Sequence, residues 1–348
     1  LRHVLSRQAP THASAASHNN HWGVPLSLAR LPEDASYGVF ELGMNHAGEI
    51  RGLVAQVRPH VALITAIAPA HLEFFPSVEA IANAKSEIFE GLEPGGVAVI
   101  NRDDEHHARI RAHAERCRAG RVVTFGRHPA ADWRLQELRL GTDGSDVVAG
   151  RSGRRLAYRI GVPGEHVALN SLGVLAVAEA LGADVAHAAG SLADLRAAAG
   201  RGERRRVALG GREILLIDES YNANPASMRA ALALLGQMPG RRVAVLGDML
   251  ELGEQAGQLH AALAASVEQA GVERVFTCGR HMTWLQDALP AARRGAHAAD
   301  SASLLAVVAD ALRTGDAVLV KGSLGSRMKH IVDALVPAGT PSGSRAER

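Results

Sequence analysis

Residues 64–89 read ITAIAPAHLEFFPSVEAIANAKSEIF, and residues 37–45, a short way upstream, read YGVFELGMN. Both segments begin with a continuous apolar run and end in polar residues, and helical patterns flank both of them. Apolar runs of this kind are typical of strands that a parallel sheet buries on both faces. The two segments therefore predict two strands of an open α/β sheet.

Polar side chains follow both predicted strands at their carboxyl ends. Glu41 closes the first run, and His71 and Glu73 follow the second. Ligands of open α/β sheets bind outside the carboxyl ends of the strands, so we expect these side chains to converge on one crevice. An apolar-periodic helix over residues 78–89 carries Lys85 on its polar side. A carboxylate, an imidazole and a lysine are thereby offered to one site.

The rest of the first 200 residues alternates strands with helices. The second of these two strands is expected over residues 61–67, further strands are expected over 97–100 and 122–125, and the apolar periodicity places helices between them. This alternation predicts a parallel, doubly wound sheet. Residues 133–162 break the rhythm with Gly-containing turns between short alternating runs, and they predict antiparallel hairpins appended to the sheet. Residues 11–21, rich in small polar side chains, are expected to form a loop.

The pattern restarts after a Gly- and Arg-rich connector at residue 201, which predicts a second α/β domain. We expect a first domain over residues 1–200, a second over 201–336, and a disordered tail over 337–348, which has no apolar face to bury. Helices over 167–181 and 184–199 close the first domain. The second is expected to hold a hairpin over 206–217, helices over 225–237, 258–269, 301–312 and 326–335, and strands over 243–246, 274–278 and 317–321.

Composition limits the function classes. The 348 residues are 47% apolar, which is enough for two domains that each bury a core. A formal net charge of +2, with no aromatic residues among the arginines at 201–206, argues against a nucleic-acid partner. The two cysteines, Cys117 and Cys278, lie far apart and fit a reducing compartment. No apolar run reaches the roughly 18 residues of a membrane span, so we expect a cytoplasmic protein.

Each candidate residue also has a purely structural interpretation. Glu41 offers the oxygen that Mg²⁺ prefers beside nucleotide phosphates, or else it caps a helix or pairs with an arginine. His71 is either a site residue or a strand-end histidine bonded to the backbone. Lys85 is either a site residue or a solvated helix lysine. A lysine beside a metal can act as a nucleophile, or it can capture carbon dioxide and become an anionic ligand.

Five segments together resemble the Mur ligases. They are ELGMNHAGEI at 41–50, AHLEFFPSVEAIANAKSEIFEGL at 70–92, DESYNANPASM at 218–228, LGDMLELG at 246–253 and VKGS at 320–323. The resemblance covers nearly the whole chain and is strongest to the members that add D-alanyl-D-alanine to a UDP-N-acetylmuramoyl-tripeptide. It implies a central ATPase domain built on a parallel sheet, followed by a C-terminal Rossmann-like domain.

Two parts of the family pattern do not occur in this sequence. The family has an N-terminal domain that grips the UDP-sugar, and its central domain carries a Gly-rich phosphate loop that ends in Lys and Thr. No G-x-x-G-K-[ST] run is present in the 348 residues. We therefore expect a ligase fragment with little activity of its own, in which residues 1–8 correspond to the helix after the phosphate loop.

The resemblance assigns metal roles to three residues. Glu41 would bind the first of two Mg²⁺ ions, and His71 would bind the second. Lys85 would lie beside the second ion as a carbamylated lysine. Glu41, His71 and Lys85 would thus form the catalytic centre of the implied enzyme.

The resemblance also implies an ATP site. Asn170 would contact the adenine, although Val167 stands where many relatives have another Asn. Arg201 would approach the nucleotide, and either Asp218 or Glu219 would hold the ribose. On spacing alone, Asn170 is also an ordinary helix-face amide, and the two acids are also the polar end of a strand.

Five further residues are implied to contact the substrates, namely Asn20, Asn222, Asn224, Lys321 and Ser323. In the implied reaction, ATP phosphorylates the tripeptide carboxylate, and the amine of D-alanyl-D-alanine attacks the acyl phosphate to give an amide. Cell-wall precursor synthesis by a monomer is the expected setting. The alternatives are another Mur ligase, an enzyme like folylpolyglutamate synthase, and a non-catalytic binding protein that has lost ATP chemistry.

Overall fold

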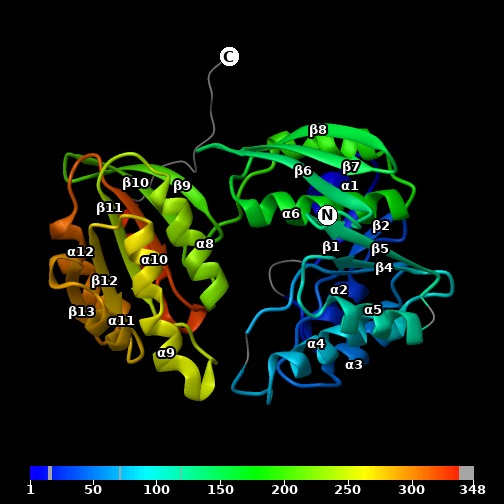
Figure 1. The fold of residues 1–348 in the computed structure, drawn as a ribbon, viewed down its shortest axis with the longest axis horizontal. Coiled ribbons are helices and arrows are strands. Elements are labelled where there is room, and N and C mark those ends of the chain that lie inside the picture. Colours follow the sequence, from blue (N-terminus) through cyan, green and yellow to red (C-terminus); the bar gives the residue numbers. More distant parts are fainter. Residues whose placement is uncertain (15–17, 70–71, 118, 337–348) are drawn as a thin grey trace. The chain divides into compact units, whose positions relative to one another are not determined.

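The computed structural model describes residues 1–14, 18–69, 72–117 and 119–336. The chain forms two compact units that part between Leu195 and Arg196 (Figure 1). Each unit holds a six-stranded sheet in which most neighbouring strands are parallel, which confirms the predicted α/β class. Within the described ranges, no helix has both the length and the apolar character that crossing a bilayer requires.

The sheet of the first unit has the strand order β3-β4-β5-β6-β7-β8. The pairs from β3 to β6 are parallel, and β7 and β8 are added as antiparallel hairpins, as the Gly-containing turns predicted. The strands are β3 (Val61–Ile64), β4 (Val97–Asn101), β5 (Arg121–Gly126), β6 (Trp133–Leu140), β7 (Ser145–Arg151) and β8 (Arg154–Ile160).

Helices cover both faces of this sheet. Helix α6 (Glu165–Ala180) lies on one face and comes close to it at Gly173, where a Cβ atom would stand 3.2 Å from both Leu63 and Phe125. The opposite face buries Phe89, Ile100 and Ile110 in one core. That face is covered by α4 (Val78–Ser86), the short helix η1 (Glu87–Gly91) and α5 (His107–Arg116). Helix α4, which carries Lys85, packs through Ile81 and Ala84 into a second core, with Met44, Ile50 and Phe75.

The predicted strand at residues 37–42 lies outside the six-stranded sheet, so that expectation is wrong. Strand β2 (Tyr37–Val39) pairs in parallel with β1 (Thr11–Ala13) in a separate two-stranded sheet. Strand β1 lies within the segment that was expected to be entirely loop. The three residues of β1 show no alternation of apolar and polar side chains, so the sequence gives no strand signal there. Backbone hydrogen bonds hold the segment in place, among them one from the Ser36 N–H to the Pro10 carbonyl at 2.9 Å.

Glu87 ties the segment after β2 to the segment that carries Lys85. Its buried carboxylate accepts hydrogen bonds from the backbone N–H of Gly48, at 2.8 and 3.0 Å, and of Arg51, at 3.1 Å. These donors belong to the first turn of α3 (Glu49–Val57), where a negative charge is stabilising. The polypeptide that follows Glu41 is therefore fixed against the end of α4.

The sheet of the second unit has the order β13-β12-β11-β14-β10-β9, with only β9 antiparallel to its neighbour. Helices α8 to α11 share one core with the sheet, and α12 and α13 share the other. The strands are β9 (Glu203–Leu209), β10 (Arg212–Glu219), β11 (Arg242–Gly247), β12 (Arg274–Cys278), β13 (Arg294–Ala298) and β14 (Ala317–Lys321). The helices are α8 (Pro225–Gly236), α9 (Ala256–Ala261), α10 (Leu263–Gln269), α11 (Met282–Ala288), α12 (Ser301–Ala311) and α13 (Lys329–Leu335).

Several predicted helices differ from the observed ones. The predicted helix over 258–269 is two helices, α9 and α10, and the predicted helix over 184–199 contains only α7 (Val185–Ser191) and a short 3-10 turn. That turn begins at Leu192, whose carbonyl accepts the Gly161 N–H at 2.9 Å, a tertiary contact that helical propensity does not reveal. Helix α11 and edge strand β13 were missed. The mixed polar and small residues of β13 give no strand pattern.

Candidate functional site

Lys85 is the centre of the charged crevice at the carboxyl edge of the first sheet. It lies in the last turn of α4, whose first turn is capped by the Ser77 hydroxyl, which accepts the Ala80 N–H at 3.2 Å. Burial lowers the pKa of Lys85 below its ordinary value, while the carboxylates of Asp104 and Glu41 act in the opposite direction. The structure therefore brings Lys85 and Glu41 together, and it adds Asp104 to them.

Glu41 is exposed, with one carboxylate oxygen anchored to the loop that precedes α2 (Gly23–Ala29). The Asn19 amide donates to Glu41 Oε1 at 2.9 Å, and the Asn19 carbonyl accepts the Gly43 N–H at 2.8 Å. The carboxylate is thus held in place but remains accessible to a cation. The neighbouring Asn20 has a structural role here, since its Oδ1 accepts the N–H of Trp22 and of Gly23 at 3.1 and 2.9 Å.

Asp104 is a site residue that the sequence interpretation missed. One of its carboxylate oxygens accepts the Ile67 N–H at 2.6 Å, and the other accepts the His106 N–H at 2.9 Å. It thereby links the loop after β3 to the loop after β4, just where Lys85 lies. The signal was available, because Asp103 and Asp104 lie just beyond the strand predicted at 97–100, as Glu41 lies at the end of the run at 37–42.

The oxygen donors of this crevice are of the kind that fits Mg²⁺, but the described residues do not complete a cage. His71 lies outside the described residues, and Glu73 is exposed. Within the described part of the chain, no group of three or more His, Cys, Asp or Glu side chains could hold a metal ion. A partial set is compatible with Mg²⁺, which usually keeps several waters and takes one or two carboxylates plus substrate phosphates.

In the second unit, the sequence-predicted acids Asp218 and Glu219 lie at the end of β10 in different surroundings. Asp218 is 1% exposed, and its carboxylate accepts the Gly200 N–H at 3.2 Å and both the N–H and the hydroxyl of Ser220, at 3.0 and 2.6 Å. Glu219 is more accessible and pairs with Lys321. Asp218 therefore fixes the backbone, whereas Glu219 presents a carboxylate at the edge of the sheet.

Lys321 is almost completely buried at the carboxyl end of β14, with 2% of its surface exposed. Its ammonium donates to Glu219 Oε2 at 3.2 Å and to the Asn222 carbonyl at 2.9 Å. Burial lowers the pKa of Lys321, the Glu219 carboxylate opposes that shift, and the Arg201 guanidinium adds to it. The guanidinium of Arg201 stacks over the Tyr221 ring, with Cζ 4.4 Å from the centre of the ring.

The other candidate residues of this unit make mainly structural bonds. Asn224 caps α8, accepting the Ser227 N–H at 2.8 Å. The Asn222 side chain accepts the Ala223 N–H at 2.8 Å. The Ser323 hydroxyl accepts the Leu250 N–H at 2.9 Å and donates to the Ala223 carbonyl at 3.3 Å. In the first unit, Asn170 is exposed near the start of α6, where it is free to meet a ligand.

A pocket of 360 Å³ opens at the carboxyl ends of β11, β12 and β13, and we call it the edge pocket. It holds four charged side chains, those of Asp248, Arg280, Asp300 and Arg327, beside the apolar Leu250. Its remaining lining residues are Cys278, Gly279, Ala299, Ser301, Gly325 and Ser326. The sequence interpretation missed it, although a Gly-Arg pair directly follows the strand predicted at 274–278.

The edge pocket depends on a close approach at Gly279. A Cβ atom there would stand 2.5 Å from the Asp248 carboxyl carbon, and the glycine has a φ of +103°. Only glycine tolerates both the close approach and the positive φ without strain. The Asp248 carboxylate then accepts the N–H groups of His281 and Met282, at 2.9 to 3.2 Å. One wall of the pocket is therefore fixed by backbone bonds.

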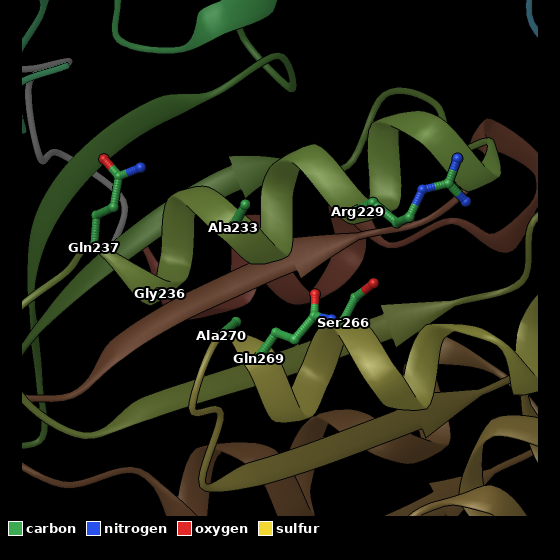
Figure 2. Close-up of a pocket in the computed structure, with 7 residues that line it drawn as sticks. All are labelled: Arg229, Ala233, Gly236, Gln237, Ser266, Gln269 and Ala270. Carbon is green, nitrogen blue, oxygen red and sulfur yellow. The ribbon is translucent and has the colours of Figure 1, made fainter. Parts of the chain in front are cut away.

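A second pocket of 430 Å³ lies between α8 and α10, away from these groups (Figure 2). Its charged lining residue is Arg229, and the other six are small or neutral: Ala233, Gly236, Gln237, Ser266, Gln269 and Ala270. The lining of this second pocket has no acidic side chain to balance Arg229, unlike the lining of the edge pocket. Arg229 is therefore a suitable control for arginines of the edge pocket.

Comparisons with known proteins bear on the family. Residues 1–178 match the Mur ligase middle domain, and residues 200–324 match the Mur ligase, glutamate ligase domain. The chain belongs to the Mur ligase family. The UDP-N-acetylmuramoyl-tripeptide–D-alanyl-D-alanine ligase of Escherichia coli K12 is 34% identical over 340 residues, covering 97% of this chain and 73% of that protein.

Among the Mur ligases, the chain is of the MurF type. A crystal structure of MurF from Acinetobacter baumannii is 30% identical with a TM-score of 0.86, covering 96% of this chain and 72% of that one. The MurF ligase of Thermotoga maritima, solved in complex with ADP, has a TM-score of 0.81, covering 96% of this chain and 75% of that one. At 24% identity, that second likeness shows a shared fold.

The buried pair of this Mur ligase in its second unit predicts a measurable coupling. In a double-mutant cycle of Lys321→Met and Glu219→Gln, we expect a coupling energy of about 1 to 3 kcal/mol in the free energy of unfolding, because Glu219→Gln leaves the buried Lys321 ammonium without its counter-charge. Urea unfolding followed by circular dichroism measures it. The exposed pair Lys329 and Asp333 is the control, with an expected coupling of at most about 0.5 kcal/mol. Equal coupling energies in the two cycles would contradict the conclusion that burial strengthens the pairing of Lys321 with Glu219.

Proposed function

We propose that this Mur ligase catalyses the ATP-dependent addition of D-alanyl-D-alanine to a UDP-N-acetylmuramoyl-tripeptide. The observation that carries the proposal is the crevice in which Lys85 faces the carboxylates of Glu41 and Asp104, in a chain with MurF-type relatives along nearly its whole length. Such a crevice suits phosphoryl transfer, in which catalysis is mostly positioning and charge neutralisation. An acid–base hydrolase would need a different arrangement of groups.

The reaction has two steps. A carboxylate oxygen of the tripeptide attacks the γ-phosphorus of ATP, ADP leaves, and an acyl phosphate forms. The amine of the dipeptide then attacks the acyl carbon, inorganic phosphate leaves, and the amine loses a proton as the amide forms. Both steps bring anions or electron-rich groups together, so they require groups that hold the reactants in line.

Three residues of the first unit would hold the metal ions of this reaction. Glu41 would bind one Mg²⁺, and His71 together with a carbamylated Lys85 would bind a second. Bound there, Mg²⁺ supplies neutralisation of the phosphate charge. Asp104 keeps the loop before His71 in place through the Ile67 N–H.

Each unit carries residues that we propose for contact with the nucleotide. Asn170 would contact the adenine from α6, and Arg201 would approach the nucleotide from its position over Tyr221. For the ribose we propose Glu219 over Asp218. The Asp218 carboxylate already makes three hydrogen bonds to its own unit and is 1% exposed, whereas Glu219 is accessible.

The edge pocket is the place that we propose for the dipeptide. A dipeptide is a zwitterion at neutral pH, and the pocket offers Arg280 and Arg327 to a carboxylate and the exposed Asp300 to an ammonium. Leu250 supplies an apolar surface for methyl groups. Lys321 and Ser323, which the family resemblance implies for substrate contact, lie at the end of the neighbouring strand β14. The Ser323 hydroxyl accepts the Leu250 N–H, and the Ser323 N–H donates to the Asp248 carbonyl. Asn20, Asn222 and Asn224 would contribute by shaping their loops.

Binding of the dipeptide tests the acceptor assignment. Arg280→Gln and Arg327→Gln should each weaken D-alanyl-D-alanine binding about 10- to 150-fold, because each removes a charge-assisted hydrogen bond worth about 1.5 to 3 kcal/mol. Isothermal calorimetry on the chain measures this. Arg229→Gln, in the pocket of Figure 2, is the matched control and should bind normally. Equal loss in all three variants would contradict the placement.

Product formation tests the reaction. With ATP, Mg²⁺ and the tripeptide substrate, mass spectrometry should find the UDP-N-acetylmuramoyl-pentapeptide only when D-alanyl-D-alanine is present. We expect the rate to lie several orders of magnitude below that of the E. coli relative, because this sequence contains no phosphate loop to hold the β and γ phosphates. Lys85→Ala should abolish the product. Ligation of glutamate or of a single amino acid in place of the dipeptide would favour the alternative of a different ligase, and dipeptide binding without product would favour a non-catalytic binding protein.

A further inference from the structure

The loop after β11, residues 248–252, forms one wall of the edge pocket through Asp248 and Leu250. It belongs to the LGDMLELG segment, whose role neither the metal crevice nor the nucleotide site explains. The loop contains a strained residue, Glu251, which has a φ of +62°. Groups outside the loop hold two of its residues. The N–H groups at the start of α11 bond the Asp248 carboxylate, and the Ser323 hydroxyl accepts the Leu250 N–H.

The bond at the residue between them comes from a histidine. His260 of α9 is 0% exposed, and its Nε2 lies 3.0 Å from the backbone nitrogen of Met249. Its Nδ1 lies 2.6 Å from the carbonyl oxygen of Ala256. A carbonyl oxygen can only accept, so Nδ1 carries the proton. Nε2 is then the unprotonated nitrogen that accepts the Met249 N–H, and the neutral ring satisfies both contacts.

Protonation of His260 breaks this arrangement. Both ring nitrogens of the imidazolium are donors, so Nε2–H would point at the Met249 N–H instead of accepting from it. The titratable groups that face the ring are Asp248, on the loop, and His281, at the start of α11, whose ring lies 5.6 Å away. Burial lowers the pKa of His260, the Ala256 carbonyl and Asp248 oppose that shift, and His281 adds to it.

We propose that His260 is a positioning residue for the dipeptide: through the Met249 N–H it holds residues 248–252 in the shape that completes the edge pocket, and only the neutral ring does so. This inference rests on the proposed acceptor role of the edge pocket. His260 touches no substrate and acts through the loop. The dipeptide affinity is therefore linked to the charge of a buried side chain outside the pocket.

The direction of the pH effect follows from the lowered pKa. The folded form with an intact clamp binds fewer protons at His260 than an open or unfolded form, whose histidine has an ordinary pKa near 6.5. The clamp is therefore at full strength above about pH 6.5 and weakens as the pH falls from there toward the folded pKa. Affinity should fall over the same range, with a limit of about tenfold per pH unit for one linked proton.

Calorimetric titration of D-alanyl-D-alanine between pH 5 and pH 8 tests the proposal. The wild-type chain should lose affinity below about pH 6.5, while His260→Gln should show a flat profile with near wild-type affinity at pH 7.5, since its amide oxygen can accept the Met249 N–H without titrating. His330→Gln, an exposed histidine of α13, should keep the wild-type profile. The same pH profile in wild type and His260→Gln would overturn the proposal.

A second measurement separates this inference from the proposed function. Amide hydrogen exchange of residues 248–252, expressed as protection factors, should fall at low pH in the wild type and stay constant in His260→Gln. Failure of the dipeptide to bind at pH 7.5 would remove the acceptor role while this exchange still reports on the clamp. Protection that does not differ between the two proteins at low pH would overturn the clamp itself.

Discussion

The half-buried charge of Lys85 imposes the main constraint on the first unit. A charge removed from water is tolerated only when opposite charges and hydrogen bonds compensate for its lost solvation. Here the compensation comes from Glu41 and Asp104, which follow different strands of different sheets. Helix α4 must therefore be packed so that its last turn meets both segments, and the core that holds its Ile81 and Ala84, together with the carboxylate of Glu87, accomplishes this.

The second unit repeats the arrangement with other residues. Lys321 ends the central strand β14 and is neutralised by Glu219, from the neighbouring strand β10. Each unit thus keeps a lysine and a carboxylate at the carboxyl edge of its sheet, where open α/β folds bind ligands. The carboxylates that hold backbone, such as Asp218, are the more deeply buried ones. Accessible carboxylates remain for ligands.

The sequence predicted most of the fold because buried parallel strands and amphipathic helices leave regular apolar patterns. It placed Glu41 and Lys85 in one crevice, and the structure brings them together. It could not show that β2 leaves the main sheet, since three residues of pattern do not reveal a pairing partner. Helix α11 was within reach, because Met282, Leu285 and Leu289 have helical spacing.

The missed site residues were of a different kind. Asp104 and Arg280 follow predicted strands, so the rule that identified Glu41 applied to them equally. Arg327 lies just before α13 and His260 lies in α9, and tertiary contacts alone reveal what they hold, as the bond from the Met249 N–H to His260 shows. Sequence patterns report which residues are buried, but they do not report which loop a side chain will hold.

The most direct test of the account is anomalous diffraction from crystals of the chain soaked with Mn²⁺ and ADP. We expect a manganese peak within about 2 to 2.5 Å of a Glu41 carboxylate oxygen, in the crevice that Lys85 and Asp104 line. Nucleotide bound in the crystal with no metal at Glu41 would contradict it.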